Sequence, residues 1–136
     1  PQLIVSPYSS RQKIELLVEG AKESIDFYFP YISDDRLEKI FMRRSGEGID
    51  IQGIVEKEFF TEELDKIEMF EKSGIVLNPI SSYKLHAKAI LVDKKYLYIG
   101  SINFSTFSLD ENREIGIILN DAKIIEQFSR IFESDF

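Results

Sequence analysis

The sequence predicts an α/β protein with a mixed sheet of six to seven strands and helices on both faces of the sheet. Two observations support this fold class. Short apolar runs typical of strands alternate with segments in which apolar residues recur at the i, i+3, i+4, i+7 spacing of an amphipathic helix. After residue 77, two strand-like runs follow each other with no room for a helix between them, which adds an antiparallel hairpin to the alternating pattern.

Composition narrows the class of protein. The chain has 136 residues, with 17 basic and 24 acidic side chains and a formal charge of −7. This length predicts one domain over residues 1–136. Because there is no cysteine and only one histidine, His86, disulfide scaffolds, thiolate metal centres, cysteine nucleophiles and multi-histidine metal sites are excluded. We expect neither a metal nor another cofactor.

Hydropathy and charge bear on location. No apolar run is long enough to cross a bilayer, and no targeting segment opens the chain. We therefore expect no transmembrane segment and a location in the cytoplasm or at the periphery of a membrane. An isoelectric point near 4.8 argues against a broad basic surface for duplex DNA. The chain begins at Pro1 and not at a methionine, so a complete protein and a segment of a longer one both stay open.

Strands and helices alternate in the first half of the chain. The expected strands are Leu3-Ile4-Val5, residues 24–29, which Pro30 ends, and residues 49–55. The first expected helix is residues 11–22, capped by Ser9 or Ser10. The second runs from a cap at Ser33 or Asp34 to about residue 45, with Leu37, Ile40 and Phe41 facing inward. The third is about residues 62–72, capped by Thr61, with Leu64, Ile67 and Phe70 buried.

The second half of the chain changes character. Residues 75–77 are a short strand, and residues 85–92 and 96–99 form two strands around a tight turn at Asp93-Lys94-Lys95. Residues 101–112 resemble a polar loop, and residues 114–119 a further strand. Asp121 can cap a last helix whose inward face carries Ile124, Ile125, Phe128, Ile131 and Phe132.

One group of polar residues in the second half indicates chemistry. His86 and Lys88 are one residue apart, so on a strand both project from the same side. A sheet buried on both faces has no place for an unpaired histidine and lysine, so we expect this pair to reach a cleft. Gly100, Ser101 and Asn103 follow the next strand, where glycine permits close backbone approach and the other two add hydrogen-bonding groups. Together these residue types suit an anionic phosphoryl group.

Each of these residues also has an ordinary structural interpretation. A lone histidine on a strand is more often a satisfied structural residue, a lone lysine is usually a surface charge, and Gly-Ser-x-Asn is a common loop. The joint pattern His-x-Lys-x(4)-Asp-x(6)-Gly-Ser-x-Asn is long and tightly spaced. For that reason we favour the functional interpretation.

At these residues the sequence resembles the phospholipase D superfamily, whose signature is HxKxxxxD with a trailing Gly-Ser-x-Asn. The resemblance implies a phosphodiesterase fold in which two copies of the motif meet across a twofold or pseudo-twofold axis. It also implies that His86 is the nucleophile that forms a phosphohistidine. Lys88, Ser101 and Asn103 would bind the phosphate oxygens.

The resemblance extends to three further positions. Glu114 matches the downstream acid that accepts a hydrogen bond from the histidine and fixes its tautomer; its ordinary interpretation is a solvated carboxylate at a strand end. Asp93, in spite of its place in the motif, matches a structural residue of the turn. Gly100 is a second structural position of the motif.

A single histidine is not enough for a covalent phosphodiesterase. One imidazole attacks phosphorus while an acid protonates the departing alkoxide, and a histidine bonded to phosphorus cannot also deliver that proton. The second histidine must come from outside these residues. We therefore expect a homodimer, or a second motif-bearing segment of a longer polypeptide. Residues 108–116 look more like one half of a two-motif bacterial lipid-type enzyme than like small dimeric nucleases.

The predicted function is a phosphodiester hydrolase or phosphatidyl-type transferase. Phospholipid is slightly favoured over nucleic acid as substrate, because the acidic balance gives little counterion-release binding to a polyanion. An endonuclease that cleaves DNA or RNA by the same chemistry is the alternative. A basic stripe along the cleft would support it, formed by Lys84, Lys88, Lys94, Lys95 and Arg113. A non-catalytic dimerisation or scaffold module is the remaining interpretation.

Overall fold

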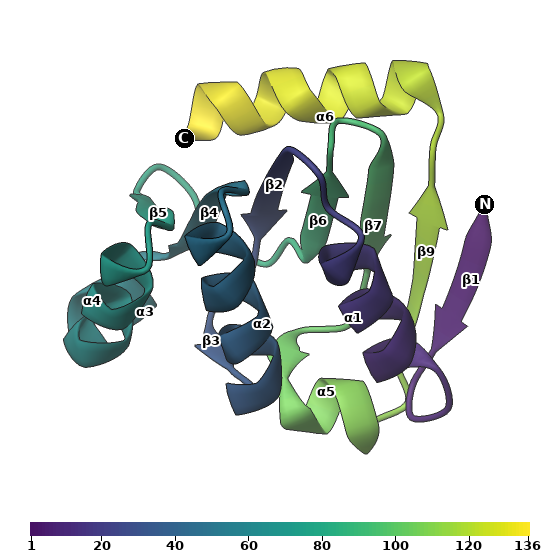
Figure 1. Ribbon diagram of the computed structural model, residues 1–136, viewed down its shortest axis with the longest axis horizontal. Helices are drawn as coiled ribbons and strands as arrows, with labels where there is room; N and C mark the ends of the chain where they lie inside the picture. The colour runs from purple at the N-terminus through teal and green to yellow at the C-terminus, as the bar shows by residue number, and fades with distance from the viewer.

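A seven-stranded mixed sheet forms the centre of the computed structural model, which describes residues 1–136. Its strands are β1 (Gln2–Val5), β2 (Ser24–Tyr28), β4 (Asp50–Glu56), β5 (Val76–Ile80), β6 (Ala89–Val92), β7 (Tyr96–Gly100) and β9 (Ile115–Leu119). They lie in the order β1-β9-β7-β6-β2-β4-β5 (Figure 1). The neighbours β2, β4 and β5 are parallel, and all other neighbours are antiparallel. The predicted α/β class and mixed sheet are confirmed.

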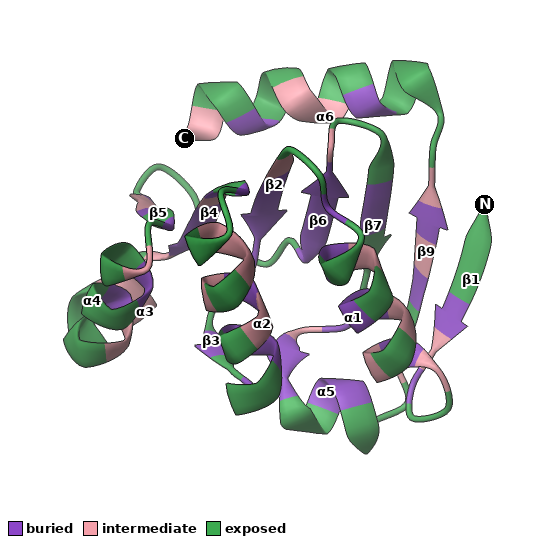
Figure 2. Ribbon diagram, viewed as in Figure 1, coloured by how far each residue is buried: buried purple, intermediate pink, exposed green.

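Helices cover both faces of the sheet. They are α1 (Ser10–Glu19), α2 (Asp35–Gly46), α3 (Lys57–Glu62), α4 (Leu64–Lys72), α5 (Thr106–Asp110) and α6 (Ala122–Asp135). The larger apolar core joins α1, α2, α4 and α5 to one sheet face through side chains such as Ile14, Phe41 and Phe70. A second core joins α6 to the opposite face through Ile125 and Phe132. Strands β2 and β6 in the middle of the sheet are buried almost throughout, whereas two of the four residues of β1 at the sheet edge are exposed (Figure 2).

Two of the predicted helix caps form as expected. Asp34 accepts a hydrogen bond from the Leu37 amide at the start of α2, and Asp121 accepts from two amides at the start of α6. Ser9 occupies the cap position of α1, but its hydroxyl makes no capping bond. None of the helices combines the length and apolar character needed to span a bilayer.

Several predicted helix details are wrong. Thr61 does not cap a helix, because the chain already turns into α3 after β4 and the next helix begins at Leu64. Leu64 points to solvent with 64% of its surface exposed, although Ile67 and Phe70 are buried as predicted. Ile124 and Ile131 are also exposed, because only a narrow stripe of α6 contacts the sheet.

Two predicted segments differ in backbone structure. The strand expected over residues 85–92 begins only at Ala89, and residues 81–88 are an unpaired connection from β5. The expected polar loop over 101–112 contains β8 (Phe104–Ser105), α5 and the buried Leu109. Strand β8 pairs in parallel with β3 (Ile32–Ser33) in a small second sheet. Isolated apolar residues between polar ones concealed this structure in the sequence.

Candidate active site

His86 and Lys88 lie in the 81–88 connection, directly before β6. The first residue of β6, Ala89, pairs with Tyr28 at the end of β2, so the two side chains sit at this end of the central strands. Although their segment is not a strand, the two side chains meet. The Lys88 Nζ atom lies 3.2 Å from Nδ1 and 3.3 Å from Nε2 of His86, and donates a 2.9 Å hydrogen bond to the His86 carbonyl oxygen.

The two residues differ in their access to solvent. His86 is exposed, whereas Lys88 is only 8% exposed. Burial lowers the pKa of the Lys88 ammonium below that of an ordinary lysine, and the negative charge of Glu114 acts in the opposite direction. A weakly hydrated ammonium beside an accessible imidazole can bind an anionic oxygen with little competition from water.

Ser101 and Glu114 form a second part of the site. The Ser101 hydroxyl donates a 2.5 Å hydrogen bond to Oε2 of Glu114. The other carboxylate oxygen accepts longer bonds, each 3.4 Å, from Ser108 Oγ and Asn112 Nδ2. Glu114 makes no hydrogen bond to His86 in this structure, so the contact that the family resemblance implied for it is replaced by the contact to Ser101.

Asn103 is the site residue whose side-chain polar atoms have no protein partner. Its Oδ1 is buried without a hydrogen bond, and its amide nitrogen makes none within the protein. Asn103 lines a hollow of about 310 Å³ together with His86 and Lys88. The Nδ2 group of this side chain can donate a hydrogen bond to a phosphoryl oxygen in a hollow that also contains an ammonium and an imidazole.

A larger hollow of about 670 Å³ also borders His86 and Lys88. Its polar lining comes from Lys84, His86, Lys88, Ser101 and Asp135. Most of the remaining wall is apolar, and comes from Tyr28, Ile80, Leu85, Ile99, Phe128 and Ile131. The site therefore connects a cationic centre to an apolar groove between α6 and the sheet.

Tyr98 and Gly100 hold the loop that carries Ser101 and Asn103. The buried Tyr98 hydroxyl accepts a 2.9 Å hydrogen bond from the Ile102 amide and donates a 3.2 Å bond to the Ile102 carbonyl oxygen. Gly100 faces Gly116 across β7 and β9, and a Cβ atom on Gly100 would lie only 2.5 Å from the Gly116 Cα. Sequence reasoning missed Tyr98, because a tyrosine in an apolar strand has the pattern of an ordinary core residue.

Asp93 lies at the other end of β6 from His86. Its carboxylate accepts hydrogen bonds of 2.8–3.1 Å from the backbone amides of Lys22, Glu23 and Ser24. Its backbone has a positive φ of 56°, a conformation that aspartate tolerates better than most residues. These contacts are structural and do not reach the site.

Glu56, at the end of β4, was also missed by sequence reasoning. Its Oε2 accepts a 2.6 Å hydrogen bond from the Leu85 amide, and its Oε1 lies 3.3 Å from Lys84 Nζ. It lines the same hollow as His86 and Asn103. No local pattern in the sequence links Glu56 to a segment 29 residues further along the chain.

The basic stripe considered in the sequence does not assemble. Lys94 and Lys95 lie in the β6–β7 turn, at the opposite end of β6 from His86, and Lys94 pairs with the buried Asp26. Arg113 stacks on the ring of Tyr8, with its guanidinium carbon 4.9 Å from the ring centre. Of the five expected cations, Lys84 and Lys88 are the two that line the hollows beside His86.

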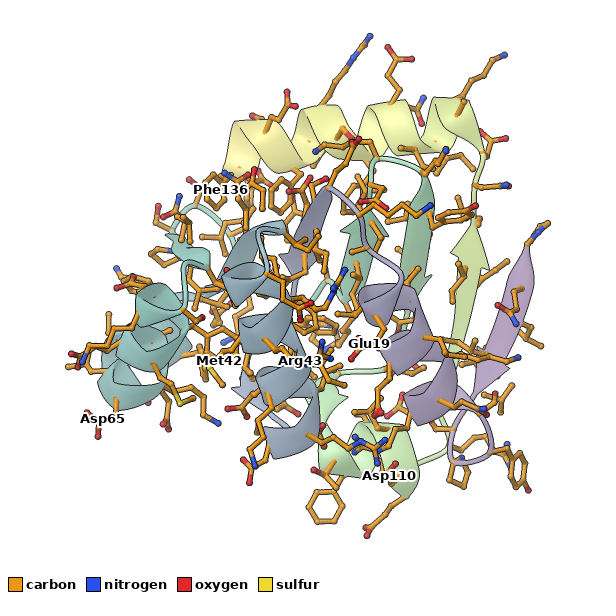
Figure 3. All side chains as sticks on the ribbon, in the orientation of Figure 1. Glu19, Met42, Arg43, Asp65, Asp110 and Phe136 are labelled. Carbon is orange, nitrogen blue, oxygen red and sulfur yellow. The ribbon has the colours of Figure 1, made fainter.

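The largest hollow lies elsewhere, between α1 and α2, with a volume of about 1090 Å³. Its arginines already have acidic partners: Arg11 binds Asp34, and Arg43 of α2 pairs with Glu19 of α1 (Figure 3). It contains no histidine. No group of three or more histidine, aspartate or glutamate side chains converges anywhere in the chain to hold a metal ion.

Comparison with known proteins identifies the family. A family model described as "Cardiolipin synthase, PLD-like domain" matches residues 14–136. The chain belongs to the phospholipase D-like family. This family comprises phosphodiesterases and transferases, and the described chain carries one copy of its motif.

Curated relatives of this phospholipase D-like chain include a hydrolase and a synthase. It is 26% identical over 130 residues to mitochondrial cardiolipin hydrolase of Mus musculus. This alignment covers 92% of the chain and 59% of the relative. It is 30% identical over 138 residues to cardiolipin synthase 1 of Bacillus anthracis. This alignment covers 94% of the chain and 26% of the relative. The chain thus spans less than two thirds of either relative.

Solved structures share the phospholipase D-like fold. Nuc of Salmonella typhimurium, a phospholipase D family member, superposes with a TM-score of 0.89 at 24% identity, covering 98% of this chain and 91% of Nuc. NucT of Helicobacter pylori superposes with a TM-score of 0.79 at 19% identity, covering 98% and 93%. At these identities the likeness establishes the fold.

Proposed function

We propose that this phospholipase D-like protein cleaves or transfers phosphodiesters through a covalent phosphohistidine at His86. The observation that carries the proposal is the position of Lys88 Nζ, 3.2–3.3 Å from both ring nitrogens of His86. A nucleophile and a buried cation thus meet in the lining of two hollows, next to the free amide of Asn103. Lys88 and Asn103 would bind the phosphoryl oxygens and stabilise the more negative transition state.

The proposed reaction has two steps. In the first, a ring nitrogen of His86 forms a bond to phosphorus as the bond from phosphorus to the leaving alcohol breaks, and a second histidine gives its proton to that alkoxide. In the second, the now neutral second histidine takes a proton from water or an acceptor alcohol. The oxygen of that molecule attacks phosphorus and breaks the phosphorus–nitrogen bond. Hydrolysis and transfer differ only in the acceptor.

The second histidine comes, in this proposal, from a second copy of the motif. His86 is the only histidine in the chain, and it is exposed and free to face a partner. A twofold axis near His86 would bring two imidazoles and two Lys88 ammonium groups to one phosphate. The partner is either an identical subunit or a second motif-bearing segment of a longer polypeptide.

A phospholipid is the substrate class that the site favours. The groove of about 670 Å³ next to His86 is walled mainly by apolar side chains, which suit the glycerol and acyl part of a lipid. The basic stripe that would support a nucleic-acid substrate does not assemble around the site. The curated relatives are named for cardiolipin hydrolysis and synthesis, which agrees with this preference. Nucleic-acid cleavage is the competing outcome of the test.

Three substrates test the proposal: bis(p-nitrophenyl) phosphate, vesicles of phosphatidylglycerol and cardiolipin, and labelled single-stranded DNA. We expect wild-type protein to release nitrophenol and to turn over the lipids, and His86→Asn to lose at least about 10³-fold in rate. Quenching with denaturant at alkaline pH during turnover should trap a label on the only histidine of the chain, because the phosphorus–nitrogen bond of a phosphohistidine is stable to base and labile to acid. Faster, salt-sensitive cleavage of DNA would instead identify a nuclease. Equal release of nitrophenol by wild type and His86→Asn would exclude the covalent mechanism.

A further inference from the structure

The segment that carries His86 has few backbone contacts of its own. Residues 81–88 connect β5 to β6 without regular structure. Among the backbone amides of residues 81–87, only that of Leu85 donates a hydrogen bond within the protein, and its acceptor is the side chain of Glu56. We infer that Glu56 is a positioning residue, which fixes the backbone next to His86 and thereby the imidazole. This inference rests on the proposed function, because the imidazole is taken to be the nucleophile.

Glu56 is itself firmly held. It is the last residue of β4, where it pairs with Ile80 of β5, and its amide donates a 3.1 Å hydrogen bond to the Pro30 carbonyl oxygen. Its side chain is only 12% exposed. The carboxylate is therefore a fixed acceptor on the rigid sheet, pointing to a segment that has no such support.

The contact to Leu85 is the stronger of the two that Glu56 makes. The Leu85 amide lies 2.6 Å from Oε2, at a residue that is 95% buried, so loss of the acceptor would leave a donor without a partner. Lys84 Nζ lies 3.3 Å from Oε1, but the Lys84 side chain is 78% exposed and water screens its charge. The acceptor oxygen, and not the charge, should determine the position of His86.

A role for Glu56 in binding the phosphate is disfavoured by its charge. A carboxylate that lines the same hollow as Lys88 repels a phosphodiester anion, and both of its oxygens already have partners in the protein. A displacement of His86 by as little as about 1 Å can cost on the order of 10²-fold in rate. Loss of Glu56 should therefore lower kcat and leave KM nearly unchanged.

Four variants separate the acceptor from the charge. Glu56→Gln keeps an oxygen for the Leu85 amide and removes the charge. Glu56→Ala removes both, and Glu56→Asp retracts the carboxylate by one methylene. Lys84→Met removes the ion pair alone. Glu62→Ala, at an exposed position of α3 whose side chain makes no hydrogen bond or ion pair, is the matched control.

With bis(p-nitrophenyl) phosphate we expect Glu56→Ala and Glu56→Asp to lose about 10- to 100-fold in kcat with KM within about twofold. Glu56→Gln and Glu62→Ala should stay within about threefold of wild type in kcat. Lys84→Met is compared by NMR alone, because Lys84 lines the hollows beside His86. If Glu56→Ala does not fold, Glu56→Asp carries the same test. Wild-type kcat in folded Glu56→Asp and Glu56→Ala, or a loss in Glu56→Gln as large as in Glu56→Ala, would overturn the inference.

A second readout does not depend on activity. Because the chain has one histidine, the imidazole Cε1–H resonance in the NMR spectrum reports on His86 alone. Glu56→Ala and Glu56→Asp should shift and broaden this resonance, whereas Glu56→Gln and Lys84→Met should leave it at the wild-type position. If wild type has no phosphodiesterase activity, the proposed function fails and the NMR result still decides whether Glu56 positions the imidazole. Unchanged spectra in all variants would overturn the inference while the proposed function stands.

Discussion

The ammonium of Lys88 lies between the ring and the peptide oxygen of His86. Its nitrogen is 3.2 Å from Nδ1, 3.3 Å from Nε2 and 2.9 Å from the carbonyl oxygen. A phosphoryl group bonded to either ring nitrogen would place its oxygens within reach of this ammonium. The rate should therefore depend on the charge of Lys88 as directly as on the nucleophile.

Activity should fall on the alkaline side as Lys88 loses its proton. Burial lowers the pKa of Lys88, so the positive form disappears at a lower pH than for an exposed lysine, whose pKa is about 10.4. We expect an alkaline limb in the pH profile of kcat/KM below that value. Lys88→Arg should move the limb upward, because arginine stays charged, and Lys88→Met should lose about 10²- to 10³-fold at neutral pH. An identical limb in wild type and Lys88→Arg would assign it to another group.

Asp93 should contribute to stability and not to the reaction. Burial alone would raise its pKa, but the hydrogen bonds from Ser24, Glu23 and Lys22 outweigh burial and lower it. A carboxylate with a lowered pKa in the folded state stabilises fully above the unfolded value of about 3.9, and this stabilisation is lost as pH falls through the folded value. Asp93→Asn tolerates the same backbone conformation and should cost about 1–3 kcal/mol in urea unfolding at pH 7.

The pH dependence of the stability difference between Asp93→Asn and wild type provides a control. Below about pH 3.9 the difference from wild type should shrink as the pH falls, because the unfolded wild-type chain then binds a proton at Asp93 more readily than the folded protein does. The kcat of folded Asp93→Asn should equal that of wild type. A lower kcat with unchanged stability would place Asp93 in the site instead.

Tyr98→Phe should affect both stability and catalysis. The change removes the hydroxyl that serves the Ile102 amide and carbonyl oxygen in a buried setting, which should cost about 1–3 kcal/mol. Because Ile102 lies between Ser101 and Asn103, we also expect a rise in KM for the phosphodiester. The comparison variant is Tyr96→Phe, on the same strand but exposed, which should match wild type in both thermal unfolding and KM.

Subunit mixing tests the need for two histidines. His86→Asn and Lys88→Met proteins are each expected to be inactive, and a mixed pair contains one His86 in total. Co-refolding the two should not restore wild-type rates. Recovery of the full rate would show that one histidine is sufficient for turnover.

Treatment with a chelator tests whether turnover needs a metal ion. Because the proposed roles belong to histidine, lysine and amide side chains, turnover of bis(p-nitrophenyl) phosphate should be unchanged after treatment with EDTA. Loss of activity that zinc or magnesium restores would contradict the mechanism.

Periodicity predicted most of the sheet and the helices α1, α2 and α6, because these elements bury one regular face. It also extended β6 to residues 85–88, since the alternation of apolar residues there is the same as in a paired strand. Whether that alternation finds a partner is decided by the register of β2 and β7, which no local pattern contains. The motif spacing indicated His86 and Lys88 as site residues, and the structure places them in contact.

Periodicity and motif spacing could not identify the residues that hold the loops of the site in place. Tyr98 and Glu56 act through hydrogen bonds to loops, and the bond from Leu85 spans 29 residues of sequence. The contact of Glu114 likewise depends on the close pairing of β7 with β9, which brings Ser101 to its carboxylate. These relationships arise from tertiary packing and leave no trace in residue spacing.

The edge position of β1 has a consequence for biosynthesis. Within the sheet, β1 hydrogen-bonds only to β9, whose residues 115–119 are made more than a hundred residues later. A nascent chain on the ribosome therefore carries β1 without its sheet partner until β9 has been made. Such late closure slows folding and exposes the growing chain to chaperones and to aggregation.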